Sequence, residues 1–144
     1  MDTKIRAIVD SKGGRVLSID GGAVVRDAVA IMNEHLIGSL LVLDGPRLIG
    51  IFTERDVLVR VVGDGRDPAT VRVGEVMTRQ IMVVEPDTTV QQAMSLMTTR
   101  RCRHLPVLED GRVVGLISIG DLTRWVIRDQ LRSIEDLTDF IHRA

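Results

Sequence analysis

Apolar residues recur at two different spacings along this 144-residue chain. In residues 4–11, 24–35, 53–62 and 90–97 they fall three or four positions apart, which is typical of one apolar face on an α-helix. In residues 16–19, 39–43, 48–52, 81–84, 105–108 and 113–117 they form short, nearly continuous runs, as in buried β-strands. The pattern also predicts one helical turn at 73–78, a long helix at 122–132 and a last short helix that begins at residue 133.

The same succession of strand, helix, two strands and helix occurs twice. From Val25 to Leu58, each residue aligns without a gap with the residue 65 positions later, and nine of the 34 pairs are identical. We therefore predict an α/β (α+β) protein with two βαββα repeats. The first occupies residues 1–62 with an N-terminal helix, a linker follows at 63–73, the second repeat spans 74–132, and a C-terminal helix spans 133–144. Because each repeat is small, we expect the two sheets to pack face to face with pseudo-two-fold symmetry.

Composition excludes several classes of function. The formal net charge is only −1 and aromatic residues make up 2% of the chain, so we expect neither nucleic-acid binding nor attraction to an anionic membrane. The single cysteine rules out an internal disulfide framework, and no apolar segment is long enough to cross a bilayer. No catalytic triad, phosphate loop or metal-ligand spacing is present, so the sequence predicts a protein that is not an enzyme and holds no metal. The N-terminus lacks an apolar signal core, so we expect a cytoplasmic location.

Two equivalent segments carry the candidate chemistry: GIFTERD at residues 50–56 and GLISIGD at residues 115–121. Each has a glycine, an apolar strand end, a hydroxyl residue and an aspartate three positions after that hydroxyl. The first interpretation is a helix cap, in which the hydroxyl and the aspartate accept hydrogen bonds from free backbone amides. The second adds a ligand, because a helix N-terminus attracts phosphate and a carboxylate accepts hydrogen bonds from ribose hydroxyls. Duplication of the segment favours a nucleoside phosphate.

These segments, the ungapped repeats, VMT at 76–78 and RHLPVL at 103–108 closely resemble a pair of cystathionine-β-synthase (CBS) domains, or Bateman module, over residues 4–130. TERD and SIGD are similar in particular to stand-alone bacterial CBS-pair proteins assigned to signal transduction. The resemblance implies a sensor of cellular energy or a regulatory module. It also implies adenosine-containing ligands, namely AMP, ADP, ATP, NAD(H) or S-adenosylmethionine, bound in two clefts that the repeats share.

The resemblance implies two sets of ligand-binding residues. One cleft would hold Thr53, Asp56, Thr88, Ala93, Arg103, His104, Leu105 and Pro106. Its twin would hold Ser118, Asp121, Ser18, Ile19, Ala23, Ala28, Gly38, Ser39 and Leu40. Arg103 and His104 are expected to bind phosphate in the first cleft, and Arg55 to reach phosphate in the twin. Because Gly38 and Ser39 stand where the second repeat has this basic pair, we expect the twin cleft to prefer a less charged part of a ligand or to stay empty.

The sequence thus predicts a regulatory module that binds an adenine nucleotide or a related ligand and signals to a partner protein that it does not name. A homodimer is expected, without catalytic cofactor or catalytic residues. The alternative is a structural module whose clefts stay empty and whose repeats serve dimerisation and partner binding.

Overall fold

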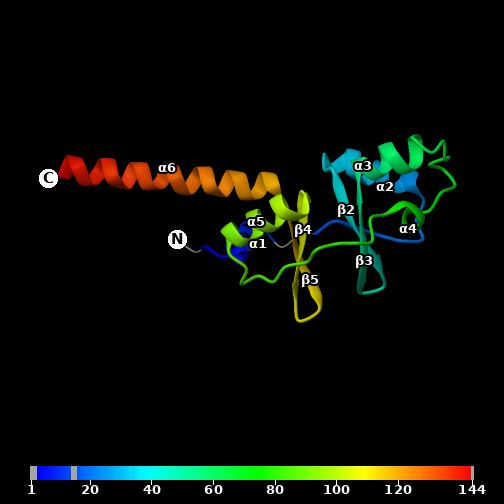
Figure 1. The fold of residues 1–144 in the computed structure, drawn as a ribbon, viewed down its shortest axis with the longest axis horizontal. Helices are drawn as coiled ribbons and strands as arrows, with labels where there is room; N and C mark the ends of the chain where they lie inside the picture. Colours follow the sequence, from blue (N-terminus) through cyan, green and yellow to red (C-terminus); the bar gives the residue numbers. More distant parts are fainter. Residues whose placement is uncertain (1–2, 14–15, 144) are drawn as a thin grey trace. The chain divides into compact units, whose positions relative to one another are not determined.

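The computed structural model describes residues 3–13 and 16–143, and Figure 1 shows their secondary structure. Residues 1, 2, 14, 15 and 144, which the predicted domain ranges include, lie outside the described residues. The chain is a mixed α/β protein that divides into two compact units. The first-repeat unit comprises residues 15–83 and 110–113, and the second-repeat unit comprises residues 1–14, 84–109 and 114–144.

The first-repeat unit is a three-stranded sheet with four short helical segments. Strands β1 (Ser18–Asp20), β2 (Ser39–Asp44) and β3 (Arg47–Thr53) lie in the order β1-β2-β3. The β1 strand pairs in parallel with β2, whereas β2 and β3 form an antiparallel hairpin that places Ser39 opposite Thr53. Helix α2 (Val25–His35) connects the parallel strands, and α3 (Glu54–Asp56), η1 (Val57–Val62) and α4 (Val73–Val76) follow β3.

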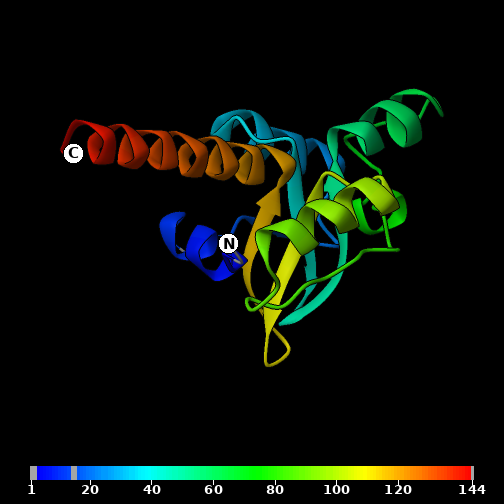
Figure 2. The ribbon, with the colours of Figure 1, turned by 60° about the vertical axis from the view of Figure 1, so that its left-hand side comes forward.

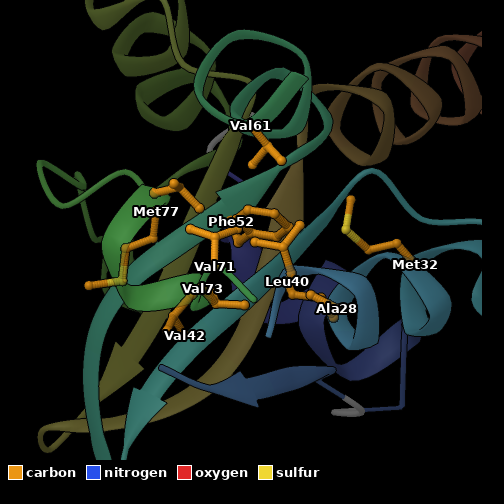
Figure 3. Close-up of a cluster of buried hydrophobic side chains, with 11 residues drawn as sticks. Ala28, Met32, Leu40, Val42, Phe52, Val61, Val71, Val73 and Met77 are labelled. Atoms are coloured by element: carbon orange, nitrogen blue, oxygen red, sulfur yellow. The ribbon is translucent and has the colours of Figure 1, made fainter. Parts of the chain in front are cut away.

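The core of this unit forms where the sheet, α2, η1 and α4 meet (Figure 3). Phe52 and Leu40 are cross-strand partners at its centre, and both are completely buried. Side chains from the helices and from the segment before α4 surround this pair: Val25, Ala28, Met32, Val42, Val61, Val71, Val73, Val76 and Met77. Phe52 directly precedes Thr53, so the core fixes the strand end at which the first motif begins.

The second-repeat unit contains α1 (Ile5–Ser11), α5 (Val90–Arg100), the hairpin β4 (His104–Glu109) and β5 (Arg112–Ser118), and α6 (Ile119–Arg143). The strand predicted at 81–84 is wrong: only Val84 pairs, in a single parallel bridge with Val107. The equivalent place in the first repeat has a bond from the Leu41 amide to the Leu17 carbonyl. Pro106 occupies the position of Leu41 and has no N–H to donate, so the strand is reduced to a bridge.

The segment before each repeat packs on the other repeat. In the second-repeat unit the amides of Ile5 and Val90 donate to the carbonyls of Thr88 and Thr3. In the first-repeat unit the same two bonds run from Val73 to Ala23 and from Val25 to Val71. Helices α1 and α4 are therefore equivalent elements, 68 positions apart. The N-terminal helix, predicted above as part of the first repeat, makes its hydrogen bonds to the second.

The motif glycines allow this exchange of segments. A Cβ on Gly50 would lie 2.6 Å from the Met77 sulfur and 2.8 Å from the Thr78 carbonyl oxygen. A Cβ on Gly115 would lie 2.9 Å from a methyl group of Val9. Val9 and Met77 are themselves 68 positions apart, so each glycine gives room to the segment that comes from before the other repeat.

Two helix predictions need correction. The helix predicted at 53–62 is α-helical only over Glu54–Asp56 and continues as the π-helical segment Val57–Val62. No break occurs at Ser133, because α6 runs without interruption from Ile119 to Arg143. Residues 121–144 contain no glycine or proline, so nothing in this stretch interrupts the backbone hydrogen-bond series.

Candidate functional site

The first motif forms a complete capping box at the start of α3. The Asp56 amide donates to Thr53 Oγ1 at 3.2 Å, and the Thr53 amide donates to Asp56 Oδ2 at 3.0 Å. The local interpretation of the motif as a helix cap is therefore confirmed. Asp56 is only 5% exposed, so its charge is held close to the helix N-terminus, where the backbone dipoles favour an anion.

Further contacts join Asp56 to the segment after α4. Thr78 Oγ1 lies 3.0 Å from Asp56 Oδ1 and 3.3 Å from Oδ2, so one hydroxyl donates across the carboxylate. Arg60 Nε lies 3.8 Å from Asp56 Oδ1, and its guanidinium also donates to the Met77 carbonyl at 2.7 Å. Because Arg60 is half exposed and its ion pair is long, hydroxyl and amide donors are the closest partners of Asp56.

The second motif has the same cap but different partners. The Ser118 amide donates to Asp121 Oδ2 at 2.9 Å, and the Asp121 amide donates to Ser118 Oγ at 3.1 Å. Lys12 Nζ lies 2.8 Å from Asp121 Oδ2 and also donates to the Leu116 carbonyl. Arg124 donates to the other carboxylate oxygen at 2.8 Å. Two cations thus contact Asp121 directly, whereas Asp56 has one distant cation.

These contacts predict a difference in acid stability. Burial on its own raises the pKa of Asp121, but the hydrogen bonds from Lys12 and Ser118 and the Lys12 charge outweigh it, so the pKa lies below its usual 3.8. A lowered pKa stabilises the fold above the unfolded-state pKa, and this contribution is lost as pH falls through the folded-state value. We expect Asp121→Asn to flatten the loss of unfolding free energy below about pH 4.

Chemical unfolding at several pH values between about 5 and 2.5 measures this effect. Asp129→Asn, an exposed carboxylate on the same helix, is the control and should keep the wild-type pH dependence. An unchanged slope in Asp121→Asn would show that the Lys12 contact does not contribute to acid stability.

The other predicted residues of the first-repeat unit fall into two groups. Gly38 and Ser39 lie beside the first motif, since the Glu54 amide donates to the Gly38 carbonyl at 3.0 Å and Ser39 pairs with Thr53. Ala28 and Leu40 are completely buried members of the hydrophobic core. Ser18 is exposed and Ile19 and Ala23 are half-buried along β1 and the turn after it, whereas Arg55 is exposed. Gly38 and Ser39, assigned above to the twin cleft, thus adjoin Thr53.

The second-repeat unit repeats this arrangement. The Ile119 amide donates to the Arg103 carbonyl at 2.9 Å, which places Arg103 beside the second motif as Gly38 lies beside the first. Ala93, Leu105 and Pro106 are buried, whereas Thr88 and His104 are half-buried. Arg103 is exposed, and its guanidinium makes no hydrogen bond or ion pair with any residue that the structure describes.

Sequence reasoning missed four residues that contact the two carboxylates: Lys12, Arg60, Thr78 and Arg124. Arg60 and Arg124 follow the aspartates at helical spacing, which is a signal that the sequence contains. Lys12 and Thr78 come from the exchanged segments before the repeats. Helices α1 and α4 of these segments are offset by 68 positions, which differs from the 65 of the repeat itself, so the ungapped alignment did not reveal the two residues.

Comparison with known proteins gives this duplicated arrangement a family. Residues 2–63 and 73–128 match the family model for the CBS domain. This chain belongs to the CBS domain family. It is a tandem CBS pair of the regulatory, signal-transduction type, and its mixed α/β fold is the fold of CBS-pair proteins.

Individual CBS-domain proteins are similar to this chain in sequence and in structure. The mitochondrial CBS domain-containing protein CBSX3 of Arabidopsis thaliana is 36% identical over 148 residues, which cover 96% of this chain and 72% of CBSX3. A structure from Burkholderia ambifaria MC40-6, described as a signal-transduction protein with CBS domains, is 43% identical, covers 89% of this chain and 96% of its own, and gives a TM-score of 0.85. A hexameric CBS-CP12 protein from bloom-forming cyanobacteria is 30% identical, with a TM-score of 0.75, and covers 100% of this chain and 90% of its own.

No helix in the part of the chain that the structure describes is both long and apolar enough to span a bilayer. Within the same residues, no three His, Cys, Asp or Glu side chains are grouped closely enough to hold a metal ion.

Proposed function

We propose that this CBS pair binds an adenosine-containing ligand, namely AMP, ADP, ATP, NAD(H) or S-adenosylmethionine, and thereby regulates a partner protein. The observation that carries the proposal is the buried carboxylate at the helix N-terminus, which occurs once in each repeat. Vicinal ribose hydroxyls donate two hydrogen bonds in a geometry that suits a carboxylate.

Asp56 is the better candidate for ribose. Its carboxylate accepts two contacts from one hydroxyl, that of Thr78, and a ribose hydroxyl is a neutral donor of the same chemistry. Exchanging one hydroxyl donor for another needs no separation of charges. At Asp121 a ribose would have to displace or share the contacts of Lys12 and Arg124, both at 2.8 Å. We therefore propose that the Asp56 motif provides the higher-affinity site.

Arg103, His104 and Arg55 are proposed to bind the phosphate groups. Arg103 and Arg55 are exposed, and neither guanidinium pairs with an acidic group among the described residues, so each is available to an anion. The proposal also includes the remaining predicted contacts with the ligand. Beside Asp56 these are Thr88, Ala93, Leu105 and Pro106, and beside Asp121 they are Ser18, Ile19, Ala23, Ala28, Gly38, Ser39 and Leu40. Because Ala28, Ala93, Leu40 and Leu105 are completely buried in the core, we expect backbone groups to make these contacts.

Ligand binding is proposed to act by shifting the population of conformations that a partner protein recognises, without catalysis by this chain. The cyanobacterial CBS-CP12 protein is hexameric, which supports self-association in proteins of this type. We propose a homodimer and a cytoplasmic location, with energy sensing as the role if the ligand is AMP, ADP or ATP.

Isothermal titration calorimetry with AMP, ATP, NADH and S-adenosylmethionine tests the proposal. We expect at least one of them to bind, with a dissociation constant in the micromolar range. Guanosine monophosphate is the control, because it keeps ribose and phosphate but changes the base. Absence of binding by all four at about 1 mM, which corresponds to less than about 4 kcal/mol of binding free energy, would contradict it.

A ligand-free structural module is the second candidate, and one observation favours it. Both carboxylates already have hydrogen-bond partners within their own units, so neither needs a ligand for stability. In that case the motifs act as helix caps alone, and the calorimetry above would detect no binding.

A further inference from the structure

Helix α6 carries a surface that the CBS repeats do not use. The helix has 25 residues, whereas the match to the CBS family model ends at residue 128. In Figures 1 and 2 its C-terminal part extends past α1 and α5, with no other described element of its unit beside it. Six large apolar side chains of α6, five of them after residue 128, are at least half exposed: Ile127, Leu131, Ile134, Leu137, Phe140 and Ile141. Exposed apolar residues in such a group mark an interaction surface.

Most of these side chains lie on one stripe. Ile127, Leu131, Ile134, Thr138 and Ile141 follow one another at spacings of four, three, four and three, which is the heptad pattern of a coiled-coil seam. At 1.5 Å per residue the stripe is about 21 Å long, or four helical turns. Leu137 borders the stripe, whereas Phe140 points away from its centre at 100° per residue. The pattern fits a second helix of similar length.

Charges along the same helix are divided between its two halves. Residues 124–132 contain three arginines and one aspartate, namely Arg124, Arg128, Arg132 and Asp129. Residues 133–143 contain the acids Glu135, Asp136 and Asp139 and one arginine, Arg143, at the last position of the helix. A parallel pair of such helices would place the two basic halves side by side, whereas an antiparallel pair would place each basic half against an acidic half.

We propose that the α6 helices of two copies of this chain associate as an antiparallel coiled coil along the stripe from Ile127 to Ile141. A second copy supplies both the complementary apolar stripe and the complementary charge order. An anionic membrane suits this surface less well, because the acidic half would be repelled from it. The inference concerns assembly and does not depend on whether an adenosine ligand binds.

The antiparallel arrangement specifies which residues meet. A coiled coil alternates layers of seam residues, so Leu131 of one copy packs against Ile134 of the other, and Ile127 against Thr138. In that register Arg128 lies beside Glu135 of the second copy, and the two-fold axis repeats the pair. In a parallel coil Arg128 and Glu135 face the uncharged residues Thr123 and Gln130 instead.

Sedimentation equilibrium of the full chain measures the association. We expect Ile134→Glu to raise the dissociation constant for this association by at least about tenfold, because it buries a carboxylate in the seam. The matched control is Phe140→Glu, which adds the same charge at an exposed apolar position of the same helix but away from the stripe, and should leave the constant unchanged. Circular dichroism checks that both variants keep their helix content.

A charge exchange tests the orientation. Arg128→Glu and Glu135→Arg should each raise the dissociation constant by up to about fivefold, because each puts like charges together across the seam. The double variant restores opposite charges in the antiparallel register and should return the constant toward the wild-type value. In a parallel coil the double variant would give no such rescue.

Each of three results would overturn the proposal. The first is a wild-type chain that stays monomeric at about 100 μM, because its association free energy would then be weaker than about 5.5 kcal/mol. The others are equal effects of Ile134→Glu and Phe140→Glu, or a double charge variant that associates no better than the single ones. Calorimetry with the adenosine ligands on the same variants should give wild-type affinities, so failure of this proposal and failure of the proposed function are separately visible.

Discussion

Replacing Asp56 with asparagine is expected to weaken binding of the adenosine ligand by about 10- to 100-fold. The ribose hydroxyls would lose their bonds to a charged acceptor, which contribute about 1.5–3 kcal/mol, and the amide NH₂ cannot accept them. The asparagine oxygen can still accept from the Thr53 amide, and its NH₂ group can donate to Thr53 or Thr78. The free energy of unfolding should therefore change by no more than about 1 kcal/mol.

Isothermal titration calorimetry and urea unfolding on the same preparation separate the two effects. Asp121→Asn is the matched control, since it makes the same change in the equivalent capping box and should leave the higher-affinity site intact. Asp56→Ala is a less selective probe, because it also leaves the Thr78 hydroxyl without its acceptor, at a cost of about 1–3 kcal/mol. Equal affinities for wild type, Asp56→Asn and Asp121→Asn would exclude both carboxylates from ribose binding.

Phe52→Ala is expected to lower the free energy of unfolding by about 3–5 kcal/mol, the largest stability change we predict. Phe52 is completely buried between the sheet and the helices of the first-repeat unit, and its removal leaves a cavity among side chains that cannot all move inward (Figure 3). The effect should also reach Thr53, the next residue, and so weaken the capping box.

Urea unfolding measures this loss, and Leu58→Ala supplies the control. Leu58 is 66% exposed on η1, so shortening it should change the free energy of unfolding by less than about 0.5 kcal/mol. A Phe52→Ala variant as stable as the control would mean that the first-repeat core contributes little to the stability of the protein.

Much of the fold was predictable because local rules act on it directly. The hydrophobic period located both repeat helices and both hairpins, and the spacing of hydroxyl and aspartate located both caps. Two predictions of secondary structure failed, the strand at 81–84 and the separate helix from residue 133. Pro106 removes a single donor and reduces a predicted strand to a bridge. The capping signal at Ser133 does not start a new helix, because α6 has no glycine or proline after Gly120 and continues through this residue.

The candidate site was predictable only in part, because its outer contacts come from distant segments. The sequence identified Thr53, Asp56, Ser118 and Asp121 from spacing alone. Lys12, the residue that follows α1, contacts Asp121 although it lies more than 100 residues away in the sequence, and no local pattern indicates such a contact. The difference in charge around the two aspartates is therefore a result of the structure.

The exchange of α1 and α4 between repeats has a consequence for the order in which the chain folds. Nearly all of the first-repeat unit is continuous, from residue 15 to residue 83, and its contacts can form while the remaining residues are still being synthesised. The second-repeat unit uses α1, which is synthesised before the first-repeat unit and must wait for residues 84 and beyond before its apolar face is covered. We therefore expect nascent chains that end near residue 83 to hold a folded first repeat and an exposed N-terminal helix that chaperones can bind.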